Sequence, residues 1–450
     1  MRANRDYGSL WLLLMKLILF IVLLGAFFIG QIIYYENTVF YYWGNYVVLL
    51  LYAANLYFTS RIYHGFNFGS ISLSEIFLSW ILCLIIANAL QYLMLSLIIE
   101  KLLPVAGFLA IISAQILLAL PISFFINKYY YKRNPAQKAI IIYDKTKKAQ
   151  EYSQIIEKHR NKFKISKIIS SNEPFEIIQK CIEKSETVFF LDVDEKLRKL
   201  LLEACFTHNK RAYILPNFTN VLLNMAEISW ISSTPMMLLK SAELDIGARF
   251  IKRSIDILLS LLIIIALSWL MAITWLIIRL YDHKPAIYKQ TRITKGGRHF
   301  VLFKFRTMRE DAEDDGIPRL STKDDKRVTP FGRFIRKIRI DELPQLFNVL
   351  GGSMSLVGPR PERPEIAKQY EEAYPNFSFR TKVKAGITGY AQVYGRYSTA
   401  PDEKLLMDIM YIGNFSIWQD AILLLQTIKV VFMPSRTGGV ENGSVTALRK

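Results

Sequence analysis

The chain has 450 residues, of which 52% are hydrophobic, and its formal net charge is +19. A mean hydropathy of +0.22, with apolar residues in long blocks, excludes an ordinary soluble protein and predicts a membrane protein. The positive charge indicates an anionic partner, which can be a nucleic acid, an anionic lipid or a phosphorylated substrate. The cysteines are too widely separated for a disulfide framework or a zinc site of the usual spacing.

Four apolar runs predict four membrane-spanning helices, at 11–33, 39–58, 76–99 and 105–126. Each run is close to the roughly 20 residues that a helix needs to cross a bilayer. The first is too long for a signal peptide, and no small-residue cleavage site follows it. Basic residues precede the first span and follow the fourth, whereas the first and third loops carry only Lys101. We therefore expect the N-terminus and everything after the fourth span to be cytoplasmic.

Residues 136–240 have the alternating pattern of a soluble α/β unit. Short apolar runs predict the strands of a parallel, Rossmann-like sheet with helices between them; the runs are 139–143, 167–169, 187–191 and 211–215. The residues after the first strand, 144–148, contain no glycine, so the turn that lets a pyrophosphate approach the backbone is missing. We expect a structural or regulatory role for this unit rather than dinucleotide binding.

A fifth apolar run, 254–278, has basic residues at both ends. Positive charge on both sides favours leaving both ends in the cytoplasm, so the segment is expected to enter the membrane and turn back. Ser268 and Trp269 are the expected place of the break, because a serine hydroxyl can bond a preceding carbonyl and help bend a helix. The alternative is a plain fifth span, which would place residues 284–450 outside the cell against their charge.

Two short strands are predicted around the Gly296-Gly297 turn. Lys304 and Arg306 end the second strand and share one face by alternation, where they can receive phosphate oxygens. The alternative for this pair is a solvated strand edge. We expect the loop at 310–327, which mixes acidic and basic residues, to be solvated, and we assign it no metal.

Two adjacent carboxylates, Asp341 and Glu342, follow a basic run that contains Arg333, Arg336, Lys337 and Arg339. Carboxylates beside cations suit the handling of phosphate and a divalent metal. The alternative is an ordinary helix start, with Asp341 accepting backbone N–H bonds and Pro344 in the first turn. On this stretch alone the helix start is the favoured interpretation.

Three further segments contain candidate functional residues: a proline-rich stretch, a glycine-rich loop and the start of an apolar helix. Prolines at 359, 361 and 364 fix an extended backbone from which Arg360 projects. Glycines in the loop at 384–396 allow a ligand to approach the backbone closely. Asp420 stands just before an apolar helix at 421–433, which it can cap.

These blocks, in their order, closely resemble the bacterial sugar transferase family, the polyprenyl-phosphate glycosyl-1-phosphate transferases, over about residues 248–439. The matching blocks are KRSID (252–256), KFRTM (304–308), IDELPQLFNVL (340–350), MSLVGPRPE (354–362), GITGYAQV (386–393) and NFSIWQD (414–420). The whole chain resembles the large form of the family, which starts capsule, O-antigen or exopolysaccharide repeat units.

The resemblance implies an α-helical membrane protein with α/β parts, in three domains. They are a four-helix transmembrane domain at 1–134, a Rossmann-like cytoplasmic domain at 135–245, and a catalytic domain at 246–450 that contains the re-entrant helix-break-helix and a small mixed α/β fold. It further implies the bacterial inner membrane, with the catalytic domain in contact with lipid on the cytoplasmic side, and it suggests a homodimer.

The implied reaction transfers a sugar 1-phosphate from a UDP-sugar to undecaprenyl phosphate and releases UMP. Asp341 matches the carboxylate that forms an aspartyl-phosphosugar, and Glu342 matches its partner associated with Mg²⁺. Other matching positions are expected to hold phosphates or to line the same site: Arg336, Arg360, Lys304 and Asp420. A carboxylate can attack phosphorus only if metal and cations neutralise the surrounding negative charge.

Three departures from the family pattern stand out. Ser-Pro is common where this chain has Ser268-Trp269, an acidic residue is usual at Ser353, and Pro and Asn are common where Ala385 and Tyr394 stand.

Two other functions stay open, a glycosyltransferase that releases UDP and a membrane-anchored scaffold of a polysaccharide assembly. We expect no nucleic-acid binding, because no recognition helix, zinc spacing or RNA motif occurs. The sugar stays open among galactose, glucose and a modified N-acetylhexosamine.

Overall fold

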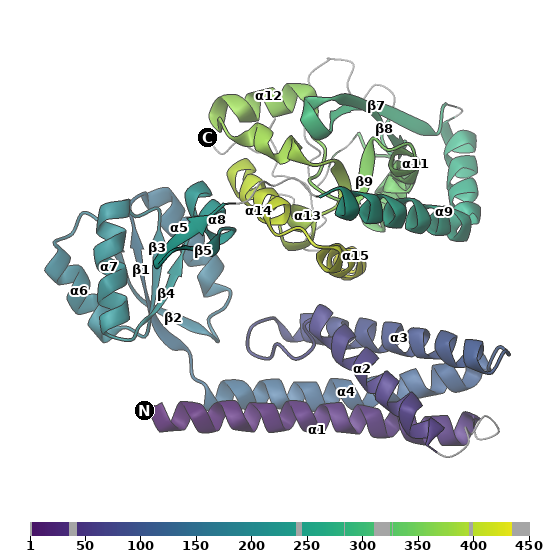
Figure 1. The fold of residues 1–450 in the computed structure, drawn as a ribbon, viewed down its shortest axis with the longest axis horizontal. Helices are drawn as coiled ribbons and strands as arrows, with labels where there is room; N and C mark the ends of the chain where they lie inside the picture. Colours follow the sequence, from purple (N-terminus) through teal and green to yellow (C-terminus); the bar gives the residue numbers. More distant parts are fainter. Residues whose placement is uncertain are drawn as a thin grey trace. The chain divides into compact units, whose positions relative to one another are not determined.

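The computed structural model describes residues 2–35, 43–239, 245–282, 284–309, 325, 327–395 and 399–433. Its contacts divide the chain into two compact units, Met1–Leu215 and Pro216–Lys450. Figure 1 labels the elements of both units, and each unit is described here by itself.

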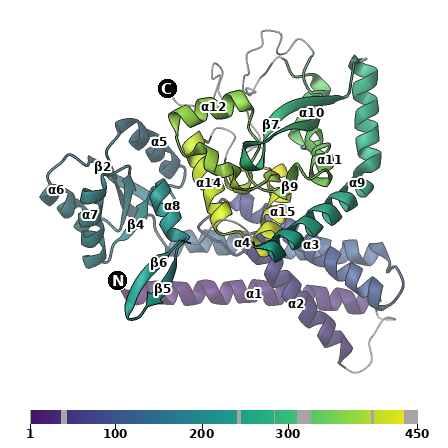
Figure 2. The ribbon, with the colours of Figure 1, turned by 45° about the horizontal axis from the view of Figure 1, so that its top comes forward.

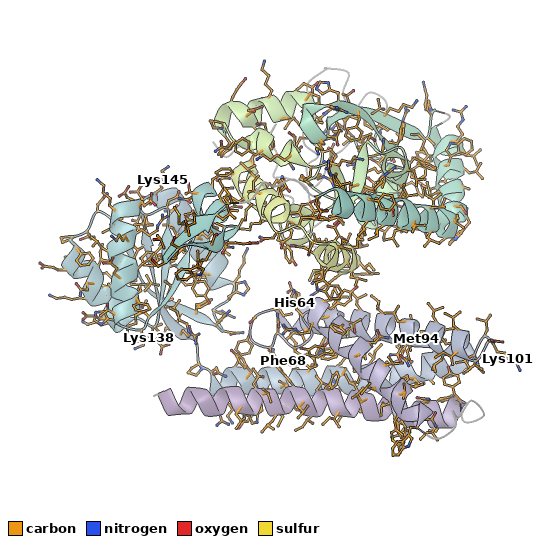
Figure 3. All side chains as sticks on the ribbon, in the orientation of Figure 1. His64, Phe68, Met94, Lys101, Lys138 and Lys145 are labelled. Atoms are coloured by element: carbon orange, nitrogen blue, oxygen red, sulfur yellow. The ribbon has the colours of Figure 1, made fainter. Side chains whose placement is uncertain are left out.

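The first unit opens with four helices: α1 (Arg2–Tyr35), α2 (Gly44–Ile62), α3 (Leu73–Ile98) and α4 (Val105–Arg133). Helix α1 packs along α4, and α3 packs against both α2 and α4. Lys101 lies in the turn that joins α3 to α4 (Figure 3). In the described chain, four helices are long and apolar enough to cross a membrane: Leu10–Tyr35, Leu73–Ile98, Val105–Arg133 and Ile246–Tyr281.

Helix α2, which corresponds to the predicted span at 39–58, is not among those four. It has only 19 residues and carries Asn45, Asn55 and Arg61, which lower its hydropathy. The first residues of the predicted span, up to 42, lie outside the described part of the chain. The other three N-terminal predictions each correspond to a long apolar helix.

Buried polar side chains tie the four N-terminal helices together. Asn88 Nδ2 donates to Gln115 Oε1 at 2.7 Å, and Tyr52 Oη donates to the same oxygen at 3.1 Å. Gln115 Nε2 in turn donates to the carbonyl of Leu23 at 2.9 Å. Hydrogen bonds between side chains in an apolar bundle fix how the helices pair, so this network sets the register of α1 to α4.

The rest of the first unit is a parallel sheet with helices between its strands. Strand order is β2-β1-β3-β4, and every pair is parallel, as the sequence predicted. The elements are β1 (Gln137–Tyr143), α5 (Thr146–Glu157), β2 (Phe163–Ser170), α6 (Phe175–Lys184), β3 (Thr187–Leu191), α7 (Glu195–Thr207) and β4 (Arg211–Ile214). Buried apolar residues of β1 and β3 form its core.

The second unit begins before the predicted catalytic domain. Its first elements are α8 (Phe218–Asn224) and an antiparallel hairpin of β5 (Glu227–Ile231) and β6 (Thr234–Leu238). Val221 of α8 is buried in the main hydrophobic core of this unit. The predicted boundary at 245 therefore lies inside the unit, and the hairpin was not predicted.

The remaining elements surround that core (Figure 1). They are α9 (Ile246–Asp282), β7 (Ile287–Ile293), β8 (His299–Phe305), α10 (Pro330–Lys337), α11 (Gln345–Leu350), β9 (Met354–Val357), α12 (Pro364–Ala373), β10 (Ala385–Thr388), α13 (Tyr390–Tyr394), α14 (Pro401–Gly413) and α15 (Ile417–Val431). Strands β7 and β8 pair antiparallel. Gly296 and Gly297 turn the chain between them with φ of 68° and 74°, which confirms the predicted hairpin. Most of the 310–327 loop lies outside the described residues.

Helix α9 differs from the prediction at Ser268 and Trp269. Helical structure runs through both residues without interruption over 37 residues, so the predicted break is wrong as a break in the helix. The predicted serine contact is present, since Ser268 Oγ donates to the Ile265 carbonyl at 2.9 Å. Figure 2 shows α9 as two arms joined at a bend. A serine hydroxyl bonded to a preceding carbonyl can bend a helix without ending it.

Both arms of α9 pack against the second unit. Leu259 and Ile263 of the first arm contact the main core, and Ile278 lies in a second cluster with Phe305 and Ile335. A straight helix of this length would extend about 55 Å at 1.5 Å per residue. The bend allows both ends of the helix to reach the same small domain.

Candidate active site

The Asp341-Glu342 pair lies in a single 3₁₀ turn, Ile340–Glu342, between α10 and α11. Arg339, just before it, has a left-handed backbone with φ of 61°, which costs a non-glycine residue on the order of 1 kcal/mol. The favoured alternative, that Asp341 caps a helix, is wrong. Helix α11 begins at Gln345 after Pro344, and no side chain caps it. The reversal at Arg339 instead turns both carboxylates inward, with exposed fractions of 8% and 9%.

Three cations converge on Glu342 from separate parts of the chain. Arg360 Nη2 donates to Glu342 Oε1 at 2.9 Å, and Lys304 Nζ of β8 approaches the same oxygen at 3.4 Å. Arg339 Nη1 lies 3.4 Å from Glu342 Oε2. The structure therefore joins Lys304, Glu342 and Arg360, which the sequence had named, with Arg339, which it had only placed in the basic run.

The two carboxyls have opposite pKa shifts. Burial, followed by the charge of Glu342, raises the pKa of Asp341 to about 6. Burial also acts on Glu342, but Arg360, Lys304 and Arg339 outweigh it and hold the pKa of Glu342 well below its usual range. Glu342 is thus held in its ionised form, whereas the raised pKa of Asp341 brings its protonation closer to neutral pH.

One oxygen of the Asp341 carboxylate is available to bind a ligand or to react. In the described part of the chain, its Oδ1 is buried and has no hydrogen-bond partner. The positive charges of Lys304, Arg336 and Arg339 act on it and partly offset the cost of its ionisation. A buried carboxylate oxygen with free lone pairs is suited to attack an electrophile or to bind a cation.

The other two predicted basic residues are Arg336 and Arg306. Arg336 of α10 donates through Nε to Thr307 Oγ1 at 2.7 Å, which holds the guanidinium close enough for its charge to act on Asp341. Arg306 follows the last residue of β8, and its Nη1 is buried with no hydrogen-bond partner among the described residues. The solvated-edge alternative does not describe this guanidinium.

Asp420 occupies a different place from the one predicted. Helix α15 starts at Ile417, and Ser416 caps it by accepting from Gln419 N at 3.1 Å, so Asp420 lies inside the helix and does not cap it. Its carboxylate forms an ion pair with Lys252 of α9 and accepts from Tyr411 Oη at 2.9 Å. Within the described residues, none of its hydrogen bonds or ion pairs reaches Asp341, Glu342 or Lys304.

The block KRSID fastens the first arm of α9 to the chain that flanks the carboxylate pair. Lys252 Nζ donates to the Val357 carbonyl at 3.2 Å. Arg253 donates to the carbonyls of Val349 and Leu350, at the end of α11, at 2.6 and 2.7 Å. Asp256 Oδ1 accepts from the backbone N–H of Leu356 at 3.0 Å. The apolar helix is therefore bonded to both α11 and β9; Glu342 lies three residues before α11, and Arg360 lies three residues after β9.

The residues of the group fit a bound Mg²⁺ ion. Magnesium prefers carboxylate oxygens, keeps several waters and takes its other ligands from substrate phosphates. Asp341 Oδ1, which is buried and unpartnered among the described residues, offers such a ligand, and Glu342 stays ionised beside it. No group of three or more His, Cys, Asp or Glu side chains suited to a metal occurs in the described chain, so a cage made only of protein does not exist in that part.

The site lies in a part of the chain that is similar to known proteins. Residues 247–434 match the profile of the bacterial sugar transferase family. The chain is 42% identical over 185 residues to UDP-N-acetylgalactosamine-undecaprenyl-phosphate N-acetylgalactosaminephosphotransferase of Aeromonas hydrophila, over 40% of this chain and 44% of the relative. It is 34% identical over 254 residues to UDP-glucose:undecaprenyl-phosphate glucose-1-phosphate transferase of Escherichia coli K12, over 55% of this chain and 53% of the relative.

A third relative is shorter. The chain is 37% identical over 201 residues to the uncharacterized sugar transferase EpsL of Bacillus subtilis, over 44% of this chain and 95% of the relative. The chain therefore belongs to the bacterial sugar transferase family. It matches about half the length of the Aeromonas and Escherichia relatives, and the matched part contains the carboxylate pair, the cations around it and α9.

Proposed function

We propose that this protein transfers a sugar 1-phosphate from a UDP-sugar to undecaprenyl phosphate, giving undecaprenyl-diphosphate-sugar and UMP. The observation that carries the proposal is the pair Asp341 and Glu342, two neighbouring buried carboxyls with opposite pKa shifts inside a ring of cations. The names of the Aeromonas and Escherichia relatives describe reactions of this kind. The product would start capsule, O-antigen or exopolysaccharide synthesis.

In the proposed first step, an Asp341 oxygen attacks the phosphorus that carries the sugar. The bond from this phosphorus to the bridging oxygen breaks, UMP leaves with that oxygen, and Asp341 holds the phosphosugar. A phosphate oxygen of undecaprenyl phosphate then attacks the same phosphorus and releases Asp341. Lys304, Arg339 and Arg360 stabilise the negative charge that gathers around the phosphorus in both steps.

Glu342, together with the free oxygen of Asp341, is the expected holder of Mg²⁺. The ion supplies charge neutralisation and orientation of the diphosphate when it is bound. Glu342 also holds the Arg360 and Lys304 side chains in place, so these cations are ordered before substrate arrives.

We further propose that α9 is a re-entrant membrane segment and that the catalytic unit lies on the cytoplasmic side of the inner membrane. The bend in α9 (Figure 2) and the basic residues at both of its ends support this orientation. The parallel sheet of the first unit would be a Rossmann-like part with a structural or regulatory role, and a homodimer remains the expected oligomer.

The test is the leaving nucleotide. Purified protein in detergent, with Mg²⁺ and undecaprenyl phosphate, is assayed against UDP-galactose, UDP-glucose and UDP-N-acetylhexosamines. We expect UMP from one of them and loss of turnover by at least about 10³-fold in Asp341→Asn, because no carboxylate is left to form the intermediate. Release of UDP would indicate the glycosyltransferase alternative, and full polysaccharide export in cells with Asp341→Asn would indicate the scaffold.

A further inference from the structure

All four backbone carbonyls of the segment that carries Arg360 accept hydrogen bonds. We call residues 359–362 the strap. At its two ends the strap bonds to backbone N–H groups: the Pro359 carbonyl accepts from Gly386 N at 2.9 Å, and the Glu362 carbonyl accepts from Ile293 N at 3.1 Å. The ends of the strap are therefore fixed to β10 and β7.

The two central carbonyls of the strap accept hydrogen bonds from guanidinium groups. Arg380 Nη2 donates to the Arg360 carbonyl at 2.9 Å, and Arg292 Nη1 donates to the Pro361 carbonyl at 3.1 Å. Because Pro359 and Pro361 also fix their own φ angles, the backbone on either side of Arg360 has little freedom. The direction of the Arg360 side chain follows from that backbone.

Arg380 is itself anchored from behind. Arg380 is 5% exposed, and its Nη2 lies 2.7 Å from Oδ2 of Asp408, a residue that is 1% exposed. Nη1 lies 3.5 Å from Glu362 Oε1, and the Phe377 ring covers the guanidinium at 4.9 Å. The planar fork thus bridges one carbonyl of the strap and two carboxylates, which a lysine ammonium cannot do in the same geometry.

We propose that Arg380, anchored by Asp408, is a positioning residue that holds the Arg360 guanidinium against Glu342. The inference rests on the proposed function, in which Arg360 meets the substrate diphosphate. Among the described residues, no hydrogen bond or ion pair joins Arg380 to Asp341 or Glu342, so its effect on the reaction passes through the strap to Arg360.

The test is a double-mutant cycle of the full chain with Arg380→Lys and Arg360→Lys, alone and together. Two experiments are run: steady-state kinetics, which gives kcat and KM for the UDP-sugar, and calorimetry, which gives the binding of UDP with and without Mg²⁺. We expect Arg380→Lys to lower kcat by roughly tenfold with a smaller change in KM, since a misplaced cation loses most in the transition state. In the Arg360→Lys background, the same change should alter kcat and UDP affinity by less than about twofold.

Controls separate positioning from a loss of folding. Arg298→Lys changes an exposed arginine of the β7–β8 turn and should leave kcat and UDP affinity at wild-type values. If Arg380→Lys does not fold, Asp408→Asn replaces it in the cycle, because it loosens the anchor and keeps the fork. Effects of Arg380 and Arg360 that multiply, or Arg380→Lys activity equal to wild type, would overturn the inference.

The two measurements also separate this inference from the proposed function. Wild-type protein that binds UDP but releases no UMP contradicts the proposed transfer, while the binding cycle still decides whether Arg380 acts through Arg360. Wild-type protein that binds no UDP under either condition contradicts both.

Discussion

Asp341 and Glu342 are neighbours in the chain, yet their surroundings assign them different protonation behaviour. Glu342 forms ion pairs with Arg360, Lys304 and Arg339. Asp341, in contrast, has one oxygen without a hydrogen bond within the described residues. Two neighbouring carboxyls with different pKa values suit two different roles. One can act as a nucleophile, and the one that stays ionised can act as its electrostatic partner.

At the residue scale, Asp341→Asn should stabilise the protein while it removes turnover. The raised pKa of Asp341 means that its contribution to folding is most favourable below the ordinary value of 3.8 and is lost as pH rises through about 6. At pH 8 the amide avoids the cost of a buried charge, and we expect a gain of roughly 3 kcal/mol. Thermal unfolding in detergent at pH 8 and at pH 5 measures it, with a smaller gain at pH 5.

Glu342→Gln is the matched control for that prediction. The folded-state pKa of Glu342 is lowered, so its ionised form stabilises the fold above the ordinary pKa, and the amide should unfold at a lower temperature at pH 8. A rise in Tm for Glu342→Gln, or none for Asp341→Asn at pH 8, would contradict the assignment of the two environments.

At the scale of elements, α9 joins a long apolar helix to the elements around the carboxylate pair. Its first arm is bonded to α11 and β9 through Lys252, Arg253 and Asp256, and to α15 through Asp420. The chain just after β9 also packs closely against β10, because a side chain on Gly386 would overlap the backbone of Gly358. A displacement of α9 therefore reaches the carboxylate pair through short, bonded paths.

Lys252→Met should destabilise the second unit by about 3 kcal/mol, because it leaves the Asp420 carboxylate buried without its cation. The double variant Lys252→Met, Asp420→Asn should recover part of that loss, since no buried charge then stays uncompensated. Thermal unfolding measures both. Arg249→Met, an exposed change one turn earlier on α9, serves as the control. Equal losses for Lys252→Met and Arg249→Met would rule out the buried pair as the cause.

Local sequence patterns predicted the helices and strands better than they predicted the contacts between side chains. Apolar runs identified the long helices and the parallel strands, and Gly296-Gly297 identified the β7–β8 hairpin, because these signals lie within a few neighbouring residues. The start of α15 also has a local signal, since Ser416 and Gln419 have the spacing of a capping box.

Contacts between distant segments had no comparable signal. The resemblance supplied Lys304 and Arg360, yet nothing in the surrounding residues marked Arg380 or Asp408 as partners of the strap. The left-handed turn at Arg339 was equally hidden, because arginine rarely adopts this backbone by itself. The assembled fold imposes both features.

At the scale of the whole molecule, the compact second unit, which contains the candidate site, starts at Pro216. We expect a chain of residues 216–450 to keep UMP release in mixed micelles, because the site and its supports all lie within it. A chain of residues 246–450 should also turn over but unfold at a lower temperature, since it lacks Val221 and the α8 contacts with the core, worth roughly 2 kcal/mol for one buried side chain. A folded but inactive 216–450 chain would show that the first unit takes part in the chemistry.

The fully bonded strap has a consequence for the energetics of substrate capture. An arginine on a free loop loses up to about 2 kcal/mol of side-chain entropy when it is ordered by a ligand. Arg360 is ordered during folding, by the carbonyl bonds around it and by Glu342. Under the proposed function, the free energy of substrate binding is not reduced by ordering this side chain, and more of it remains available to hold a diphosphate.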